Sequence, residues 1–441
     1  MSKAWERLLV QIIPRSPLLL GNRSGISNYQ ETAEVIAGSV IRGAVAEALI
    51  QQCLHTNQIA NHDDCPDPQN CPYWQLFGGE EPHFGSGYPA GTYGPSWPLP
   101  LTARTCKRHK GWTQQKKPGH GIFDALLADF AYELVSDPQF PARTQLQPVL
   151  CETWSETWRS RVRVAADHCP VCGEQLTPVK IRRRYYVWQD GPQPVHMLAK
   201  PRTVHVGINR ARGVAEDALL FTQESLVAED ESGAFFAEIG VPPAKRAALE
   251  AALYATFYIG RGRSRGYGEV QISAATASNY PELAARLAGF QTAVSRHLKP
   301  YRREDNRVRS SLPGTLFSLT LRAPAILTEW GRPLRAPTAA QLGLPAGTIL
   351  VRSWARMEQE GGWHSAARLP RRTALATQAG SVFLYFAPDG VDVGELTAVL
   401  GRIEEQGIGQ ERARGFGHVT ICAPIHTLRP EKKGGSNESS G

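Results

Sequence analysis

The sequence predicts an α+β fold made of two ferredoxin-like units, the first of which carries a long insertion. One 14-residue stretch occurs twice without a gap, at 259–272 and 408–421, and each copy follows a helix-like segment and enters a short apolar strand. Residues 53–200 break this pattern with crowded prolines, glycines, aromatic residues and cysteines. At 441 residues the chain also exceeds one ordinary core, so at least two domains are expected.

The first unit is expected to span residues 1–275, with its insertion at 53–200. A strand at 8–13 and a helix at 39–49 precede the insertion, and a hairpin follows it. The expected later elements are the hairpin at 203–222, a strand at 233–240, a helix at 243–256, and a strand after the first glycine-rich loop. The resulting order, β-α-(insertion)-β-β-α-β, is typical of the ferredoxin-like fold.

A helix and an arginine-rich linker at 276–313 lead to the second unit, which we expect at 314–426. Its elements are strands at 315–323 and 381–386, a helix at 393–405, and a last strand at 417–422. The polar tail at 427–441 is predicted to be disordered because it offers little apolar surface to bury.

The two repeated loops combine glycines with arginines, a pattern that suits phosphate. Glycines permit positive φ and leave backbone amides open, and guanidinium groups match phosphate oxygens. Arg265-Gly-Tyr-Gly and Arg414-Gly-Phe-Gly match the start of the RNA-recognition (RRM) consensus, although its later aromatic residues are missing. We therefore predict RRM-like units that hold an RNA backbone; glycine-rich turns with solvated arginines are the alternative. The loop candidates are Gly260, Arg261, Gly262, Arg263, Arg265, Arg412 and Arg414.

A second phosphate site is predicted at the start of the helix at 39–49. Ser39 is a plausible N-cap, and Arg42 lies in the first turn, where a helix favours anions. An ordinary capped helix with a surface arginine explains this stretch equally well.

The distribution of charge predicts the type of partner, and the lack of targeting signals predicts the location of the protein. The net charge is +8, and the arginines gather in clusters at 182–184, 261–265, 302–309 and 412–414, which together favour a nucleic-acid partner. The sequence shows no signal peptide and no transmembrane stretch, so we expect a cytoplasmic protein without membrane contacts. In a reducing cytoplasm the eight cysteines favour metal binding over disulfides.

The cysteines of the insertion predict one structural zinc ion. Cys169-Pro-Val-Cys172 has the spacing of a zinc knuckle, and a metal would help to order a segment with little regular structure. The second pair of ligands is expected at Cys106 and His109, with His120 and Cys151 as substitutes. Cys65 and Cys71 form another possible pair.

Several motifs resemble the repeat-associated mysterious protein (RAMP) superfamily of CRISPR effector subunits. Ile36-Ala-Gly-Ser-Val-Ile-Arg-Gly43 is similar to its Ile-Pro-Gly-Ser-x-Leu-Arg-Gly motif, and Gln75-Leu-Phe-Gly78 to its Leu-Phe-Gly element. Pro100–Cys106, the Cys169 knuckle, Val204-His-Val-Gly-Ile-Asn-Arg-Ala-Arg212 and Ala215-Glu-Asp217 resemble the large RAMP of type III-D systems, which is grouped with the crRNA 5′-handle-binding subunits. The resemblance covers most of residues 1–275 and only the glycine loop of the second half.

The resemblance implies an RNA-binding subunit of a type III interference complex in antiviral defence. Its partners would be crRNA, target RNA, backbone RAMPs and the large signalling subunit. It adds Asn209, Arg210 and Arg212 as weaker RNA-binding candidates. Backbone RAMPs that cut RNA place an aspartate before the helix, whereas residues 21–35 contain only Glu31 and Glu34 as acids. We therefore expect no catalysis; a RAMP-type endoribonuclease and a free-standing RNA-binding protein with a zinc module are the alternatives.

Overall fold

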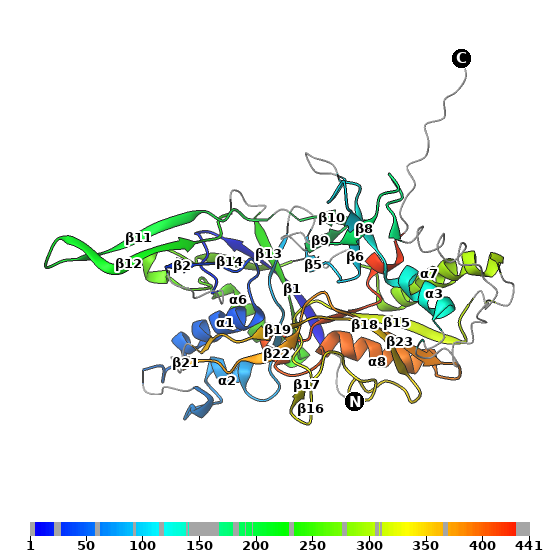
Figure 1. Ribbon diagram of the computed structural model, residues 1–441. Coiled ribbons are helices and arrows are strands. Elements are labelled where there is room, and N and C mark those ends of the chain that lie inside the picture. The colour runs from blue at the N-terminus through cyan, green and yellow to red at the C-terminus, as the bar shows by residue number, and fades with distance from the viewer. Residues whose placement is uncertain are drawn as a thin grey trace, which may run out of the picture.

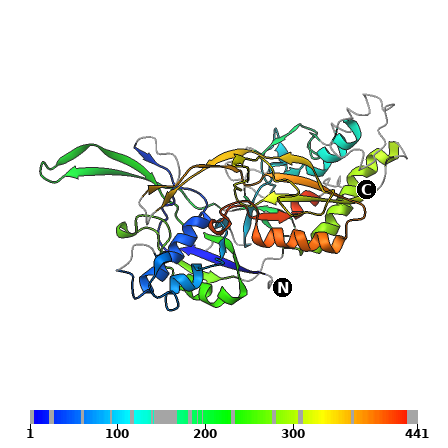
Figure 2. The same cartoon turned by 90° about the horizontal axis from the view of Figure 1, so that it is seen from below.

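The computed structural model describes residues 5–21, 28–57, 62–90, 94–113, 119–137, 140, 167–179, 185–189, 191–195, 197–228, 233–275, 280–304, 308, 311–364 and 369–428. The α+β class is confirmed: helices pack on two main sheets, which lie side by side and carry smaller sheets around them (Figures 1 and 2). None of the described helices is both long and apolar enough to span a membrane. The predicted cluster at 182–184 and the tail from 429 on lie outside the described residues.

The first sheet has the strand order β14-β1-β13-β3, with β4 also paired to β13. Every pairing on it is antiparallel. Its strands are β1 (Glu6–Pro14), β3 (His83–Phe84), β4 (Tyr88–Ala90), β13 (Ala234–Val241) and β14 (Val270–Ala274). Helices α1 (Gly38–Gln52), α2 (Pro72–Phe77) and α6 (Arg246–Tyr254) share one apolar core with this sheet.

The second sheet repeats this order as β24-β15-β23-β18, so its last and first strands are again adjacent. Its strands are β15 (Gly314–Leu321), β18 (Ile349–Trp354), β23 (Val382–Pro388) and β24 (Val419–Ile421). Consecutive residues of β15 and β23 are buried, so both faces of the sheet are covered. α8 (Val393–Gln406) lies on one side, and α7 (Leu283–Glu304) and α3 (Leu126–Ser136) lie toward the other (Figure 1).

The strand assignment within residues 53–222 needs correction. β3 and β4 lie inside the range predicted as an insertion, yet they form the edge of the first sheet. The hairpin of β11 (Arg202–Asn209) and β12 (Val214–Glu224) forms a separate sheet with β2 (Tyr29–Gln30) and projects from the body (Figure 1). β3 and β4 are two and three residues long, too short to show a periodic pattern.

The remaining insertion residues form two small sheets that reach the second half of the chain. One sheet joins β5 (Ser96–Pro98), β9 (Tyr185–Trp188) and β10 (Pro192–Pro194); the other joins β6 (Ala103–Cys106), β7 (Ile122–Asp124) and β8 (Leu176–Pro178). α3 packs its buried face into the same core as α7 and the second sheet. His426 is buried between Thr320 Oγ1 at 2.8 Å and Asp124 Oδ1 at 3.0 Å. The insertion is thereby fixed to the second half of the chain.

Short two-stranded sheets complete the second half. They are formed by β16 (Thr328–Glu329) with β17 (Arg332–Pro333), β19 (Met357–Glu360) with β22 (Ala374–Thr377), and β20 (Trp363–His364) with β21 (Leu369–Pro370).

Candidate nucleic-acid interface

The first glycine-rich loop, residues 259–268, is a tight turn bonded to the segment that follows β1. The Ile259 amide donates to Gly268 O at 2.8 Å, which closes the loop. The Arg261 amide donates to Leu19 O at 3.1 Å, and the Gly268 amide donates to Pro17 O at 3.0 Å. Between these anchors, Arg263–Arg265 form one 3-10 turn flanked by Gly262 and Gly266, at φ values of 84° and 81°. Backbone bonds therefore fix the loop without using its arginine side chains.

The arginine side chains of the first loop are exposed. Arg261 and Arg265 lie close enough to repel each other: partial burial, and then the charge of Arg265, lowers the pKa of Arg261. Arg263 makes a loose ion pair with Glu47, with 3.7 Å between Nη1 and Oε1, and both side chains are more than half exposed. Such an exposed pair contributes little and is easily replaced by phosphate.

Exposed aromatic residues directly precede the first loop. Tyr254, Phe257 and Tyr258 are 61%, 61% and 38% exposed, and the Arg263 guanidinium lies 4.2 Å from the Tyr258 ring centre. Proteins that bind single-stranded nucleic acid stack its bases on aromatic side chains and contact its phosphates with nearby cations. The sequence interpretation missed these three residues, although their spacing at the end of an amphipathic helix could have indicated them.

The second loop, residues 408–417, repeats these contacts one for one. Ile408 N donates to Gly417 O at 2.8 Å, Gln410 N to Ile326 O at 3.0 Å, and Gly417 N to Pro324 O at 2.8 Å. The turn at Arg412–Arg414 is again a 3-10 turn. Glu411 adopts a φ of 57° at the position that Gly262 fills in the first loop. The duplication seen in the sequence is therefore also a duplication of backbone geometry.

The surroundings of the second loop differ, because it packs against the start of α1 and against β3. A Cβ atom on Gly415 would lie 2.5 Å from Phe84 O, and one on Gly38 would lie 1.9 Å from the same oxygen. Arg412 and Arg414 are only half exposed, and Arg414 pairs with Glu411 at 2.6 Å. This loop therefore joins the two halves of the chain.

Ser39 and Arg42 are placed differently from the sequence prediction. α1 begins at Gly38 with Ala37 at its N-cap, and no side chain caps it, so the prediction of Ser39 as N-cap is wrong. Arg42 donates to Glu81 Oε2 from Nε at 3.1 Å and from Nη2 at 2.5 Å, and its guanidinium lies 4.7 Å from the Phe77 ring centre. Its charge is thus already partnered within the chain.

A groove of about 480 Å³ lies beside the second loop, between that loop and α8. Its polar lining includes two arginines and three glutamines: Arg402, Arg412, Gln341, Gln406 and Gln410. Guanidinium and amide groups in an open groove suit a sugar-phosphate backbone.

The remaining RNA-binding candidates lie at the tip of the projecting hairpin. Asn209 Oδ1 accepts the amides of Ala211 and Arg212, both at 3.1 Å, and so shapes the turn. Arg210 and Arg212 are exposed. Along the hairpin, apolar side chains are at least half exposed at five positions: Val204, Val206, Ile208, Val214 and Leu220. Exposed apolar patches of this kind are typical of surfaces that contact other molecules.

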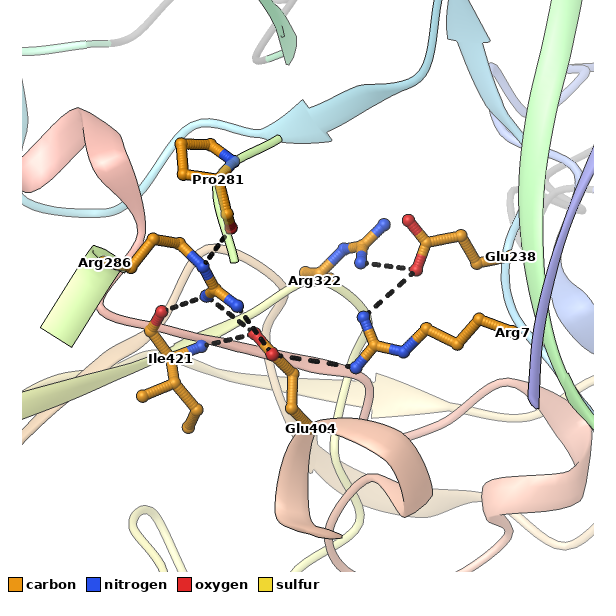
Figure 3. Close-up of polar contacts among 7 residues, drawn as sticks. All are labelled: Arg7, Glu238, Pro281, Arg286, Arg322, Glu404 and Ile421. Atoms are coloured by element: carbon orange, nitrogen blue, oxygen red, sulfur yellow. Dashed lines mark hydrogen bonds and ion pairs between the residues drawn. The ribbon is translucent and has the colours of Figure 1, made fainter. Parts of the chain in front are cut away.

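A chain of ion pairs connects the two sheets (Figure 3). Arg322, which follows β15, donates to Glu238 Oε2 of β13 at 2.8 Å. Arg7 of β1 lies 4.0 Å from Glu238 and 3.7 Å from Glu404 of α8, and Arg286 of α7 pairs with Glu404 at 2.7 Å. Burial alone would raise the pKa of Glu238, but Arg322 and then Arg7 lower it to about 2. The network therefore stays charged and fixes one half of the chain on the other.

The predicted metal site assembles with one change of ligand. Cys106, His120, Cys169 and Cys172 bring one ligand atom each within 4.8 Å of one another. Cys106 Sγ lies 3.6 Å from Cys172 Sγ, and Cys169 Sγ lies 3.4 Å from His120 Nδ1. Zinc–sulfur bonds of about 2.3 Å in a tetrahedron place two sulfurs about 3.8 Å apart, so this set fits zinc.

His109 is not one of the four clustered residues, which corrects the predicted ligand set. Its amide lies 3.3 Å from Cys106 Sγ, and its ring stacks on His120 with 4.3 Å between ring centres. The His120 amide donates to His109 O, so the backbone at His109 positions the residue that faces the thiols. Cys151 lies outside the described residues.

Glu34 and the histidine of the second loop, His418, lie in defined electrostatic surroundings. Glu34 Oε1 lies 3.6 Å from Lys200 Nζ, so its carboxylate already has a cationic partner. Burial, and then the charge of Arg322, lowers the pKa of His418 to about 3, so its ring is neutral at pH 7 and a weak base.

Comparison with known proteins supports one family. The model of the RAMP superfamily matches residues 12–271, more than half of the chain. A chain of a type III-B Cmr-beta complex bound to cognate target RNA has a TM-score of 0.37 and 9% identity, covering 85% of this chain and 86% of that one. A Cas6 product complex has a TM-score of 0.27 and 14% identity, covering 44% of this chain and 79% of that one. No curated protein matches the chain.

Proposed function

The chain belongs to the RAMP superfamily, and from that membership and its exposed cationic loop we propose that it is an RNA-binding subunit of a type III CRISPR effector complex. In this proposal each main sheet belongs to one ferredoxin-like unit. Both sheets, β14-β1-β13-β3 and β24-β15-β23-β18, place the last strand of the unit beside the first, then the third, then the second, which is the ferredoxin-like order. In the second unit, residues 322–348 between β15 and β18 are all described and contain no helix, and α7 packs on that sheet instead.

The first loop carries the proposal because backbone hydrogen bonds fix its turn while its arginine side chains stay exposed. Arg261, Arg263 and Arg265 project from one fixed loop, and Arg263 makes only a loose, exposed ion pair with Glu47, at 3.7 Å. The adjoining Tyr254, Phe257 and Tyr258 offer aromatic faces to unpaired bases. We infer that this surface holds the single-stranded 5′ handle of crRNA.

The projecting hairpin is the proposed contact with the rest of the complex. Its exposed apolar stripe suits a protein partner, and its basic tip suits RNA. The partners in this proposal are backbone RAMP subunits, the large signalling subunit and target RNA, in the cytoplasm.

We also propose that the chain itself does not cut RNA. The sequence has no aspartate at 21–35, Glu34 is paired with Lys200, and His418 is held neutral. Incubation of the purified chain with labelled repeat RNA should leave the RNA intact; cleavage that is lost in a Glu34→Gln or His418→Gln variant would favour the endoribonuclease alternative.

Binding of repeat-derived RNA tests the main proposal. Replacing Arg263 and Arg265 together with alanine should weaken binding roughly tenfold or more, since each phosphate contact also releases counterions. The slope of log K against log salt should fall by about 1.4 for two contacts to a single strand. The matched control is Lys299→Ala with Arg332→Ala, which removes two exposed cations outside both loops. Equal binding and equal slopes in both double variants would reduce the first loop to a structural turn.

A further inference from the structure

We propose that Cys53, His62, Cys65 and Cys71 bind a second zinc ion, separate from the site at Cys106 and Cys169. These four residues also bring one ligand atom each within 4.8 Å of one another, and all four are buried. Cys53 Sγ lies 4.0 Å from Cys65 Sγ, and Cys71 Sγ lies 3.9 Å from His62 Nδ1. Both distances are close to the edge of a zinc tetrahedron, about 3.6–3.8 Å. The three cysteines are free thiols.

The composition of the buried cluster around Cys53, Cys65 and Cys71 supports a metal site. The buried cluster consists of the three cysteines, with Tyr73 packed against them. Thiols and one imidazole bury too little apolar surface to order a segment between two helices. His62 is 4% exposed, and its Nε2 has no hydrogen-bond partner. The other ring nitrogen, Nδ1, faces the Cys71 thiol, so the ring can ligate a metal through Nδ1.

The donor set and its burial identify the metal and its role. Three thiolates and one imidazole in a tetrahedron are typical of Zn²⁺. Binding one ion would replace three thiol protons, leaving a net charge of −1 on the closed site. Four protein ligands leave no open position for water or substrate, so this ion would be structural.

The position of the cluster shows what such an ion would stabilise. Cys53 is the C-cap of α1, and Cys71 is the N-cap of α2. α2 carries Phe77, against which Arg42 lies, and Lys245 Nζ donates to Leu76 O and Gly78 O at its end. The zinc ion would therefore fix α2 onto the helix that supports the second glycine loop.

Zinc content per chain is the first test, measured on the full chain by elemental analysis and native mass spectrometry. We expect two zinc ions in the parent protein. Cys65→Ser with Cys71→Ser should lose one, Cys106→Ser with Cys169→Ser should lose the other, and the buried Cys422→Ser, outside both clusters, should keep both. One zinc ion in the parent, unchanged in the Cys65/Cys71 variant, would overturn the proposal.

Thiol protection tests the same site without any variant. In the parent protein, Cys53, Cys65 and Cys71 should resist alkylation and become reactive together when a chelator removes zinc. Cys422 should stay unreactive throughout, which would show that the rest of the chain remains folded. If the three thiols react equally before and after chelation, the cluster holds no metal. Neither measurement uses RNA, so the proposed RNA-binding function is tested independently.

Discussion

The two glycine loops share one backbone geometry and differ in what surrounds them. Around the first loop, a Cβ on Gly266 would meet nothing within 4 Å, and the arginines face solvent. Around the second, Gly415 touches Phe84 and Gly38, and Arg414 pairs with Glu411. The same local sequence therefore forms an exposed cationic surface in one place, where we propose RNA binding, and a contact between the two halves of the chain in the other.

The largest expected effect comes from filling the packed glycine. Gly415→Ala adds a Cβ 2.5 Å from a backbone oxygen at a φ of 91°, which combines overpacking with left-handed strain and should cost about 3–5 kcal/mol. Gly266→Ala adds only the strain at a φ of 81°, about 1–2 kcal/mol. Urea unfolding of both variants measures the difference. Equal losses would mean that the second loop is not packed as described.

Substitutions in the ion pairs between the two main sheets should have the next largest effect on stability. Arg322→Met leaves the half-buried Glu238 with Arg7, at 4.0 Å, as its ion-pair partner among the described residues. Breaking a fully buried pair costs about 3 kcal/mol or more, so this half-buried pair should cost about 2 kcal/mol. Arg7→Met, on the more exposed arginine, should cost less than about 1 kcal/mol. Adding Glu238→Gln to Arg322→Met should recover part of the loss, because no unpaired charge then remains. Absence of recovery would show that Arg322 acts through packing on Trp97 alone.

For RNA affinity we expect the reverse order: substitutions in the first loop should have a larger effect than substitutions in the second. Replacing Arg412 and Arg414 with alanine should weaken RNA binding less than about fivefold, since Arg414 is already paired and both side chains are half exposed. The Arg263/Arg265 variant should lose at least twice as much, with the greater change in salt dependence. Fluorescence anisotropy at three salt concentrations compares them. A larger loss from the second loop would identify its groove, not the first loop, as the main RNA surface.

The sequence predicted the features that depend on local pattern. The loops were found because their glycines and arginines repeat at fixed spacing, and the helices before them because of their periodicity. Even there, Glu411 at positive φ is unexpected, since glycine fills the equivalent position 262. The packed loop geometry overrides the residue preference at this position.

Features set by long-range contacts were not predictable from one sequence. His109 follows Cys106 at the spacing typical of zinc ligands, yet it is His120 that faces the thiols. The His120 amide bonds to His109 O, which brings His120 beside the cysteines. β3 and β4 are too short to show alternation, and β18 was not predicted at all. The contact of Gly415 with Gly38 joins residues far apart in sequence, where glycine alone signals only flexibility.

The smallest expected effect is a loss of stability in mild acid, and it belongs to the second loop alone. Burial and then Arg412 lower the pKa of His83 to about 4, and burial and then Arg322 lower that of His418 to about 3. Unfolded histidine titrates near 6.5, so the unfolded chain binds protons first, and stability should fall as the pH drops below about 6.5. The full shifts would give a loss of about 2 kcal/mol per histidine between pH 7 and pH 5, but both side chains are half-buried and solvent screens them. We therefore expect a total loss of about 1–2 kcal/mol, measured by urea unfolding. His418→Gln should reduce that loss, whereas the exposed first loop has no histidine and should contribute nothing. An unchanged pH dependence in the variant would mean that His418 does not remain buried and neutral where the units meet.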